Sequence, residues 1–165
     1  MRDDEWLSRR YYGGDLPAEA ERALHQAALS FSDQPLAESH LRRAWDCAPG
    51  HLAVSIGAYK FYLYHHRLVE AVPYAEACLV EAARRLGLAE DWRLARPDQA
   101  DFSSLDAEPR LFLFSLFAWG YLLIRLGRRA EGRQALVHLL TLDPADKLGV
   151  TGLLAIVDQG EPSES

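Results

Sequence analysis

The chain has 165 residues, of which 49% are hydrophobic and 25% charged, and its formal net charge is −6. This size and composition are typical of a soluble protein with one globular domain. The acidic excess argues against a general nucleic-acid-binding protein, which would present basic surface to phosphate groups. The start, MRDDEW, lacks the apolar segment of a signal peptide, and the uncharged run at residues 111–124 is shorter than the roughly 20 residues that span a bilayer. We therefore expect a cytoplasmic protein without a membrane partner.

Hydrophobic periodicity along the chain predicts helices and no strand. In the first helix, apolar residues recur at spacings of three and four from Ala20 to Phe31. The predicted helices cover residues 18–31, 35–48, 51–66, 68–86, 109–126, 129–142 and 145–158. Proline or glycine marks most of their ends. Pro73 falls within the first two turns of the fourth helix, where it would either offset the start or kink the helix. The sequence thus predicts an all-α protein built from helix pairs with short turns.

The helix pairs show a repeat of about 34 residues when Pro49 and Pro144 are placed in register. Small residues then fall at matching positions of units that start at residues 18, 52 and 113: Ala37 and Ala44, Ala71, and Gly120. This pattern resembles the tetratricopeptide repeat over residues 18–144, and LLTLDPAD is its best segment. The chain departs from the family at His25 and Tyr59, where a small residue is usual, and its middle unit lacks the final proline.

The resemblance implies a tetratricopeptide-like α-solenoid of about three helix pairs, closed by the last helix as a cap, with the first helices of the pairs lining a concave groove. We expect an N-terminal arm at residues 1–16, one repeat domain at 17–159 and a disordered tail at 160–165. An insert at residues 87–108 interrupts the domain.

The run YKFYLYHHR, residues 59–67, lies on a predicted groove-lining helix. Lys60, Leu63 and Tyr64 take groove positions, whereas Ala58, Tyr59 and Tyr62 take positions that face the partner helix. The matching groove positions of the third unit are Phe114, Phe117, Tyr121, Ile124 and Arg125, and those of the first unit are Glu19, Arg22, Gln26, Leu29 and Ser30. Aromatic and arginine side chains are frequent anchors of protein contacts. The alternative is that Phe114 and Phe117 belong to the core.

The arm and the insert also carry aromatic residues, namely Trp6 and Trp92. An insert of about 22 residues is long for a repeat connection. It either covers the aromatic groove with Trp92 as a plug, reaches a partner, or is a solvated excursion with one short helix at residues 89–96. The arm either folds onto the domain or docks on another molecule, because its aromatic side chains are costly to expose.

Signatures of catalysis and of metal binding are missing. His65 and His66 are adjacent and would point about 100° apart on a helix. The sequence contains no HExxH, CxxC, GxSxG or glycine-rich phosphate loop. We expect no catalytic, cofactor or metal site, and we expect Cys47 and Cys78 to be buried thiols rather than a disulfide.

A narrower resemblance rests on HLAVSIGAYKFYLYHHRLVEA followed by EDWR in the insert. This combination resembles the nitrogenase-associated factor T type found among nitrogen-fixation genes. The resemblance implies a non-enzymatic factor that binds the molybdenum–iron component of nitrogenase in maturation, protection or repair. The alternatives are a peptide-binding chaperone or adaptor, such as a secretion chaperone, and an enzyme with an unrecognised site. From the groove argument, the predicted protein-binding residues are Lys60, Tyr64, Phe114, Phe117, Tyr121, Arg125, Trp92 and Trp6.

Overall fold

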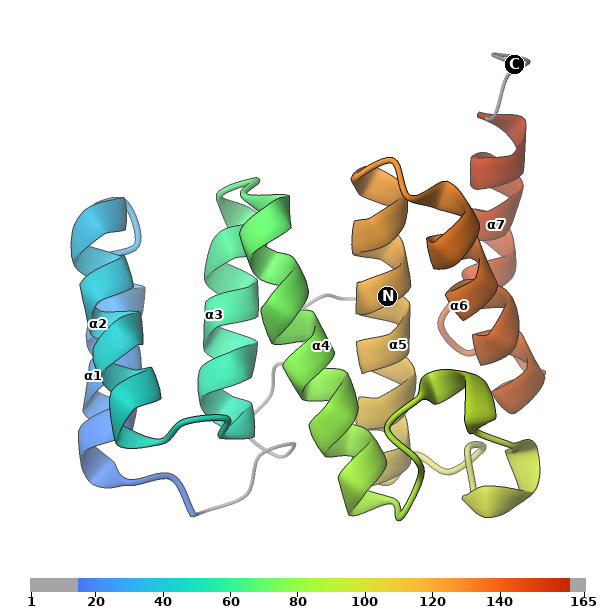
Figure 1. Cartoon of the computed structure of the whole chain (residues 1–165), viewed down its shortest axis with the longest axis horizontal. Helices are drawn as coiled ribbons and strands as arrows, with labels where there is room; N and C mark the ends of the chain where they lie inside the picture. The colour runs from blue at the N-terminus through green and yellow to red at the C-terminus, as the bar shows by residue number, and fades with distance from the viewer. Residues whose placement is uncertain (1–14, 161–165) are drawn as a thin grey trace. The chain divides into compact units, whose positions relative to one another are not determined.

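The computed structural model describes residues 15–160, and this part of the chain is helical with no strand. The α-helices are α1 (Ala18–Leu29), α2 (Gln34–Cys47), α3 (Leu52–Tyr64), α4 (Leu68–Arg85), α5 (Ala107–Arg125), α6 (Arg129–Leu142) and α7 (Val150–Gln159) (Figure 1). Two short 3-10 helices, η2 (Trp92–Leu94) and η3 (Pro97–Gln99), lie between α4 and α5. The all-α prediction is confirmed, and α6 has the predicted bounds. Helix α4 is continuous through Pro73.

The described chain divides into two compact units, residues 15–78 and residues 79–160, which we call the N-terminal and C-terminal units. The N-terminal unit holds α1, α2, α3 and the first part of α4, and the C-terminal unit holds the rest of α4 and everything after it. The prediction of a single domain at residues 17–159 stays a prediction.

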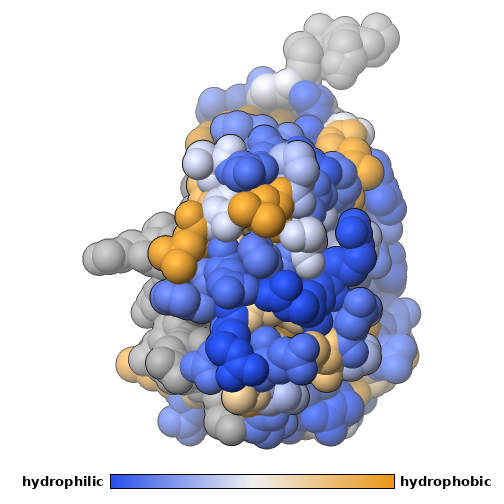
Figure 2. Space-filling view, turned by 90° about the vertical axis from the view of Figure 1, so that its left-hand side faces the viewer, coloured by the Kyte–Doolittle hydropathy of each residue, from blue (hydrophilic) through white to orange (hydrophobic). Residues whose placement is uncertain are grey.

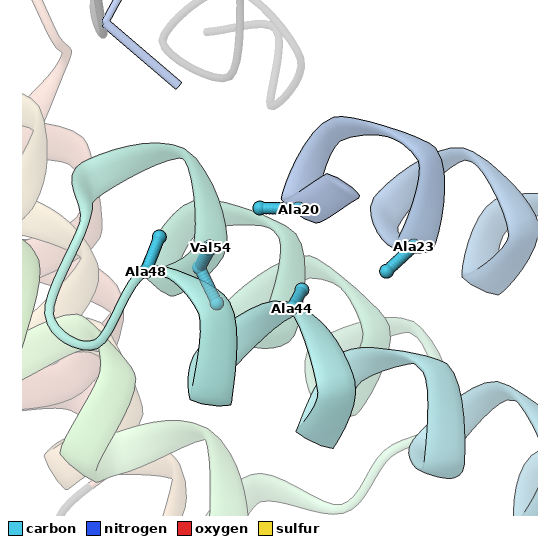
Figure 3. Close-up of a cluster of buried hydrophobic side chains, with 5 residues drawn as sticks. All are labelled: Ala20, Ala23, Ala44, Ala48 and Val54. Carbon is cyan, nitrogen blue, oxygen red and sulfur yellow. The ribbon is translucent and has the colours of Figure 1, made fainter. Parts of the chain in front are cut away.

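In the N-terminal unit, α1 and α2 pack through alanines (Figure 3). Ala20, Ala23 and Ala44 have no exposed surface. Side chains this small let two helix backbones approach closely, and Ala48 and Val54 complete the cluster. Two helices of this unit begin at side-chain caps. The Asp33 carboxylate accepts from the Leu36 amide at 3.3 Å for α2, and His51 Nδ1 accepts from the Ala53 amide at 3.0 Å for α3. Cys47 and Cys78 are both free thiols. Cys78 is buried as predicted, whereas Cys47 is partly exposed.

In the C-terminal unit, α5 and α6 lie side by side around two glycines (Figure 1). A Cβ atom added to Gly132 would lie 2.6 Å from the Gly120 carbonyl oxygen, so this backbone contact requires that residue 132 lack a side chain. The turn between the two helices contains Gly127 with a φ of +88°. Gly132 is therefore required by the close approach of the two backbones, and Gly127 is required by the left-handed conformation of the turn.

Helix α5 begins at Ala107, two residues before the predicted start. It is long and apolar enough to cross a membrane by length and composition, and within residues 15–160 it alone passes that test. However, 72% of its most apolar 18-residue window is buried inside the protein. Burial of this extent is typical of the core helix of a compact unit.

Helix α7 begins at Val150 and not at residue 145, which corrects the predicted start. The chain turns twice before this helix, because Asp146 and Gly149 have φ values of +55° and +75°. The Asp146 carboxylate then accepts from the amides of Val150 at 2.6 Å and Thr151 at 3.1 Å. These bonds lower the pKa of the Asp146 carboxyl against the opposing effect of burial. The turn that contains Asp146 therefore places the start of α7 five residues after the predicted start at residue 145.

The insert is packed against the rest of the C-terminal unit. The Trp92 ring is 6% exposed and lies 5.8 Å from the Trp119 ring and 5.5 Å from the His138 ring, measured between centroids. His138 Nε2 donates to the Ala95 carbonyl oxygen at 2.9 Å. The insert holds two 3-10 turns in place of the single helix at residues 89–96. It is therefore part of the folded unit and not a solvated excursion.

The second half of the insert is fixed in the same way. The Phe102 ring lies 5.9 Å from the Phe112 ring of α5, and its carbonyl oxygen accepts from Lys147 Nζ at 2.9 Å. Lys147 Nζ also pairs with the buried carboxylate of Asp143 at 2.8 Å. The segment before α7 is thereby tied to the insert.

Candidate functional site

An apolar groove lies between α1 and α3 in the N-terminal unit. Its volume is about 340 Å³. The lining residues are Leu24, Ala27, Ala28, Phe31, Leu41, Ala53, Ile56, Gly57, Lys60 and Phe61. This volume is at the lower end of the range for small-molecule sites, roughly 300–1,000 Å³. It suits one or two amino-acid side chains.

The sequence makes this groove by placing small residues where α1 and α3 face each other. Ala27, Ala28 and Gly57 leave space that larger side chains would fill. At Gly57 even a Cβ atom would lie 3.2 Å from Leu24 Cδ2. The outer face over α1 and α2 is by contrast mostly hydrophilic, and its hydrophobic residues form small separate patches (Figure 2).

Lys60 is the one cation of the groove lining. Its Nζ lies 5.9 Å from the centre of the Tyr64 ring, which is a weak cation–π contact. Within residues 15–160, no carboxylate pairs with this ammonium group at salt-bridge distance. The groove thus combines an apolar lining with one positive charge that is available to a ligand.

Tyr62, on the same helix, belongs to a polar network between α2, α3 and the start of α4. Its hydroxyl donates to Glu38 Oε2 at 2.8 Å, and Arg67 Nη2 donates to the same oxygen at 2.9 Å. The hydrogen bond from Arg67 holds the pKa of the Glu38 carboxyl below its usual range. Burial, followed by the bond to Glu38, raises the pKa of Tyr62. Each group has a partner, so this network fastens three helices together.

The two adjacent histidines lie beyond α3, which ends at Tyr64 and not at the predicted residue 66. His65 stacks on Phe31 with ring centroids 4.2 Å apart, and its Nε2 donates to the Phe31 carbonyl oxygen at 3.0 Å. His66 follows the helix with a φ of +59° and is exposed. Within residues 15–160, no three His, Cys, Asp or Glu side chains come together as a possible metal site.

In the C-terminal unit, α5 carries a ladder formed by Phe117, Tyr121 and Arg125, one turn apart. The rings of Phe117 and Tyr121 are stacked with centroids 6.5 Å apart, and both are partly exposed. The Arg125 guanidinium lies 5.5 Å from the centre of the Tyr121 ring and donates to its hydroxyl at 2.7 Å. The structure thus brings three of the predicted binding residues together on one helix face.

The remaining predicted residues fall elsewhere. Tyr64 lies beside Lys60 but does not line the groove, which corrects its predicted groove position. Phe114 is 1% exposed and belongs to the core, which is the alternative that the sequence left open for it. Trp92 packs on Trp119, and positions 117 and 119 of a helix point about 200° apart, so Trp92 does not plug the ladder. Trp6 and the predicted disordered tail beyond Gly160 lie outside the described residues.

Sequence reasoning missed the α1 wall of the groove. It assigned Gln26 and Leu29 to groove positions, whereas Leu24, Ala28 and Phe31 line the groove. The sequence did contain a signal for this wall, because the apolar stripe on α1 is wide enough to make two contacts. One row, Ala20, Ala23 and Ala27, is buried, which leaves the second row to face α3.

The described residues form an all-α protein in which short turns join α1 to α2, α3 to α4 and α5 to α6. An apolar groove lies between α1 and α3. No family model and no solved structure matches the chain. It is 32% identical over 140 residues to the "Uncharacterized 19.8 kDa protein in nifW 5'region" of Azotobacter chroococcum mcd 1, and the match covers 82% of this chain and 74% of that protein. The chain belongs to the same family as that protein.

Proposed function

We propose that the chain is a non-enzymatic, cytoplasmic protein-binding factor that acts in nitrogen fixation. The favoured partner is the molybdenum–iron protein of nitrogenase, during maturation, protection or repair. The relative in the nifW 5' region is the observation that carries this proposal, because it places a family member beside a nitrogen-fixation gene. The resemblance to tetratricopeptide repeats and to the nitrogenase-associated factor T type supports the same conclusion.

The chemistry of the N-terminal groove supports binding in preference to catalysis. Its lining is apolar except for Lys60, so it offers contact area and one charge. The described carboxylates with lowered pKa values are instead engaged in caps and ion pairs, such as Asp146 at the start of α7 and Asp158 with Arg133. Shifted pKa values in structural pairs do not indicate an active site.

The mechanism that we propose is surface complementarity. The factor binds one conformational state of the partner more tightly than the others and thereby raises the population of that state. In the N-terminal unit the groove receives an apolar side chain of the partner beside Lys60. In the C-terminal unit the ladder on α5 offers stacked aromatic surface and a guanidinium, which are frequent hot-spot groups.

A pull-down of the tagged full chain from its native cell, grown with and without fixed nitrogen, tests this proposal. We expect nitrogenase subunits among the proteins captured from nitrogen-fixing cells. Ala28→Arg should reduce capture because it fills the groove from an exposed position, and Phe117→Ala/Tyr121→Ala should reduce capture through the ladder. His25→Arg is the matched control, since it adds the same side chain at an exposed position of α1 outside the groove. Capture without nitrogenase subunits would contradict the proposal.

A second candidate function is a peptide-binding chaperone or adaptor. The groove itself favours it, because an apolar groove between parallel first helices can accept an extended segment. The two functions differ in the form of the partner. Binding to assembled molybdenum–iron protein supports the first, whereas binding only to its unfolded subunits or to a secreted substrate supports the second.

A further inference from the structure

A second pocket of the N-terminal unit lies between α2, α3 and the start of α4. Its volume is about 230 Å³. The lining residues are Glu38, Leu41, Arg42, Trp45, Val54, Ala58, Tyr62 and Tyr74, of which only Leu41 also lines the groove between α1 and α3. This volume is below the roughly 300–1,000 Å³ of sites for drug-sized ligands. The pocket therefore suits a compact molecule.

Three aromatic rings form a fixed corner of this pocket. The Trp45 and Tyr74 rings are nearly perpendicular, at 80°, with centroids 5.9 Å apart, and the Tyr62 ring is stacked on Tyr74 at 5.8 Å. All three side chains are partly exposed. The hydrogen bond from Tyr62 to Glu38 holds the stack in place. The corner offers pre-organised apolar surface to a ligand.

Two charged groups of the lining keep bonding capacity free. Glu38 and Arg42 lie four residues apart on α2, a spacing at which residues of opposite charge commonly pair. Here they form no ion pair with each other. Tyr62 and Arg67 instead donate to Glu38 Oε2, at 2.8 and 2.9 Å. Within residues 15–160, Glu38 Oε1 accepts no hydrogen bond, and the Arg42 guanidinium makes neither a hydrogen bond nor an ion pair. The pocket thus presents one carboxylate oxygen and one guanidinium about one helical turn apart.

These two groups select the class of ligand. The hydrogen bond from Arg67 lowers the pKa of Glu38, so its carboxylate is ionised at neutral pH, and the Arg42 guanidinium is always protonated. A purely anionic ligand would face Glu38, and a purely cationic ligand would face Arg42. A molecule with an ammonium group and a carboxylate on the same carbon atom matches both, and its apolar side chain can lie on the aromatic corner. Free α-amino acids have this combination.

We propose that this pocket binds a free α-amino acid with an aromatic or branched aliphatic side chain. The ammonium group of the ligand donates to Glu38 Oε1, and its carboxylate accepts from Arg42. The side chain of the ligand lies against Trp45 and Tyr74. Because the ligand contacts α2 and α4 at once, its binding stabilises the N-terminal unit against unfolding. This binding activity goes beyond the proposed function and does not depend on the groove or the ladder.

Isothermal titration calorimetry of the isolated full chain with L-phenylalanine and L-leucine tests this proposal. We expect saturable binding at one site per chain. N-acetylphenylalanine lacks the ammonium group, and phenylalaninamide lacks the carboxylate. Each of these two probes should bind at least about tenfold more weakly than phenylalanine, because each loses one charge-assisted contact.

Arg42→Ala is the variant that identifies the site. It removes an exposed side chain that has no partner among the described residues, so the fold should tolerate it. The affinity for phenylalanine should fall about tenfold, and phenylalanine and phenylalaninamide should then bind alike. Arg43→Ala is the matched control, because Arg43 is the next residue on α2, is exposed and does not line the pocket. It should leave the affinity unchanged.

Three results would overturn the proposal. Absence of saturable binding of either amino acid at millimolar concentration means that the pocket is not an amino-acid site. Binding that Arg42→Ala leaves unchanged takes place elsewhere on the chain. Equal affinity for phenylalanine and N-acetylphenylalanine means that Glu38 does not hold an ammonium group. None of these results involves nitrogenase, so failure here and failure of the proposed function are separate outcomes.

Discussion

Residue 132 is the place where the structure leaves least room for a side chain. A Cβ atom on Gly132 would lie 2.6 Å from the Gly120 carbonyl oxygen and 2.8 Å from Ile124 Cγ1. Because a backbone atom cannot move aside as a flexible side chain does, Gly132→Ala should separate α5 and α6. We expect a loss of about 1–3 kcal/mol in the free energy of unfolding, measured by urea titration with circular dichroism.

Gly152→Ala on α7 is the control for this prediction. Gly152 is exposed and a Cβ atom there would meet nothing within 4 Å. The substitution should stabilise by up to about 1 kcal/mol, because alanine is the better helix former. Equal effects of the two substitutions would show that the close approach of the backbones is not what Gly132 provides.

Glu81 on α4 is the carboxylate for which a pH dependence can be predicted. Its Oε2 lies 2.6 Å from Arg84 and 2.9 Å from Arg85. The hydrogen bond from Arg84 is the main cause that lowers the pKa of Glu81 to about 2, from an ordinary value of 4.5. A depressed folded-state pKa means that the ion pairs stabilise the protein above pH 4.5 and that this stabilisation is lost as the pH falls toward 2.

Glu81→Gln should therefore cost roughly 1 kcal/mol at pH 7 and little at pH 2, since Arg84 is largely exposed and solvent screens the pair. The measurement is the free energy of unfolding against pH for both proteins. Glu90→Gln, at an exposed position beyond the helix, is the comparison. Parallel pH curves for the Glu81→Gln variant and the unmodified chain would exclude this role for Glu81.

At the scale of elements, the start of α7 depends on one side chain. Asp146 has a φ of +55° and its two carboxylate oxygens accept from Val150 and Thr151. Asp146→Ala loses the cap and places alanine in a left-handed conformation, so we expect a loss of about 2 kcal/mol. Asp146→Asn keeps an acceptor and tolerates the conformation, and should lose under half as much. Hydrogen exchange of the α7 amides measures the effect, and equal exchange in the two variants would contradict it.

The sequence predicted helix existence better than helix ends, for a physical reason. The spacing of apolar residues and the positions of Pro and Gly are local signals, and they were sufficient to predict the bounds of α6. The start of α7 depended on a turn stabilised by Asp146, and the insert depended on Trp92 finding Trp119 and His138. Such contacts join positions far apart in the chain or need a specific backbone conformation, which hydrophobic periodicity does not encode.

At the scale of the whole molecule, the candidate site was predicted in part. Lys60 lies in the groove lining, and Phe117, Tyr121 and Arg125 form one ladder. These positions could be selected because helical spacing separates the face of a helix that packs on its neighbour from the face that does not. It could not identify Leu24 and Phe31 as a wall, since His25 displaces the small-residue position in α1 and the apolar stripe serves two interfaces.

The insert provides the last prediction, because its sequence suggested a lid or a docking segment. Trp92 is 6% exposed between Trp119 and His138, so its removal should leave a cavity in the C-terminal unit. Trp92→Ala should lower the free energy of unfolding by about 3 kcal/mol, and Trp92→Phe should cost less because it keeps an aromatic ring there. Chemical denaturation measures both losses. If Trp92→Ala instead leaves the stability unchanged and abolishes nitrogenase capture, Trp92 contacts the partner and the insert is a docking segment rather than part of the fold.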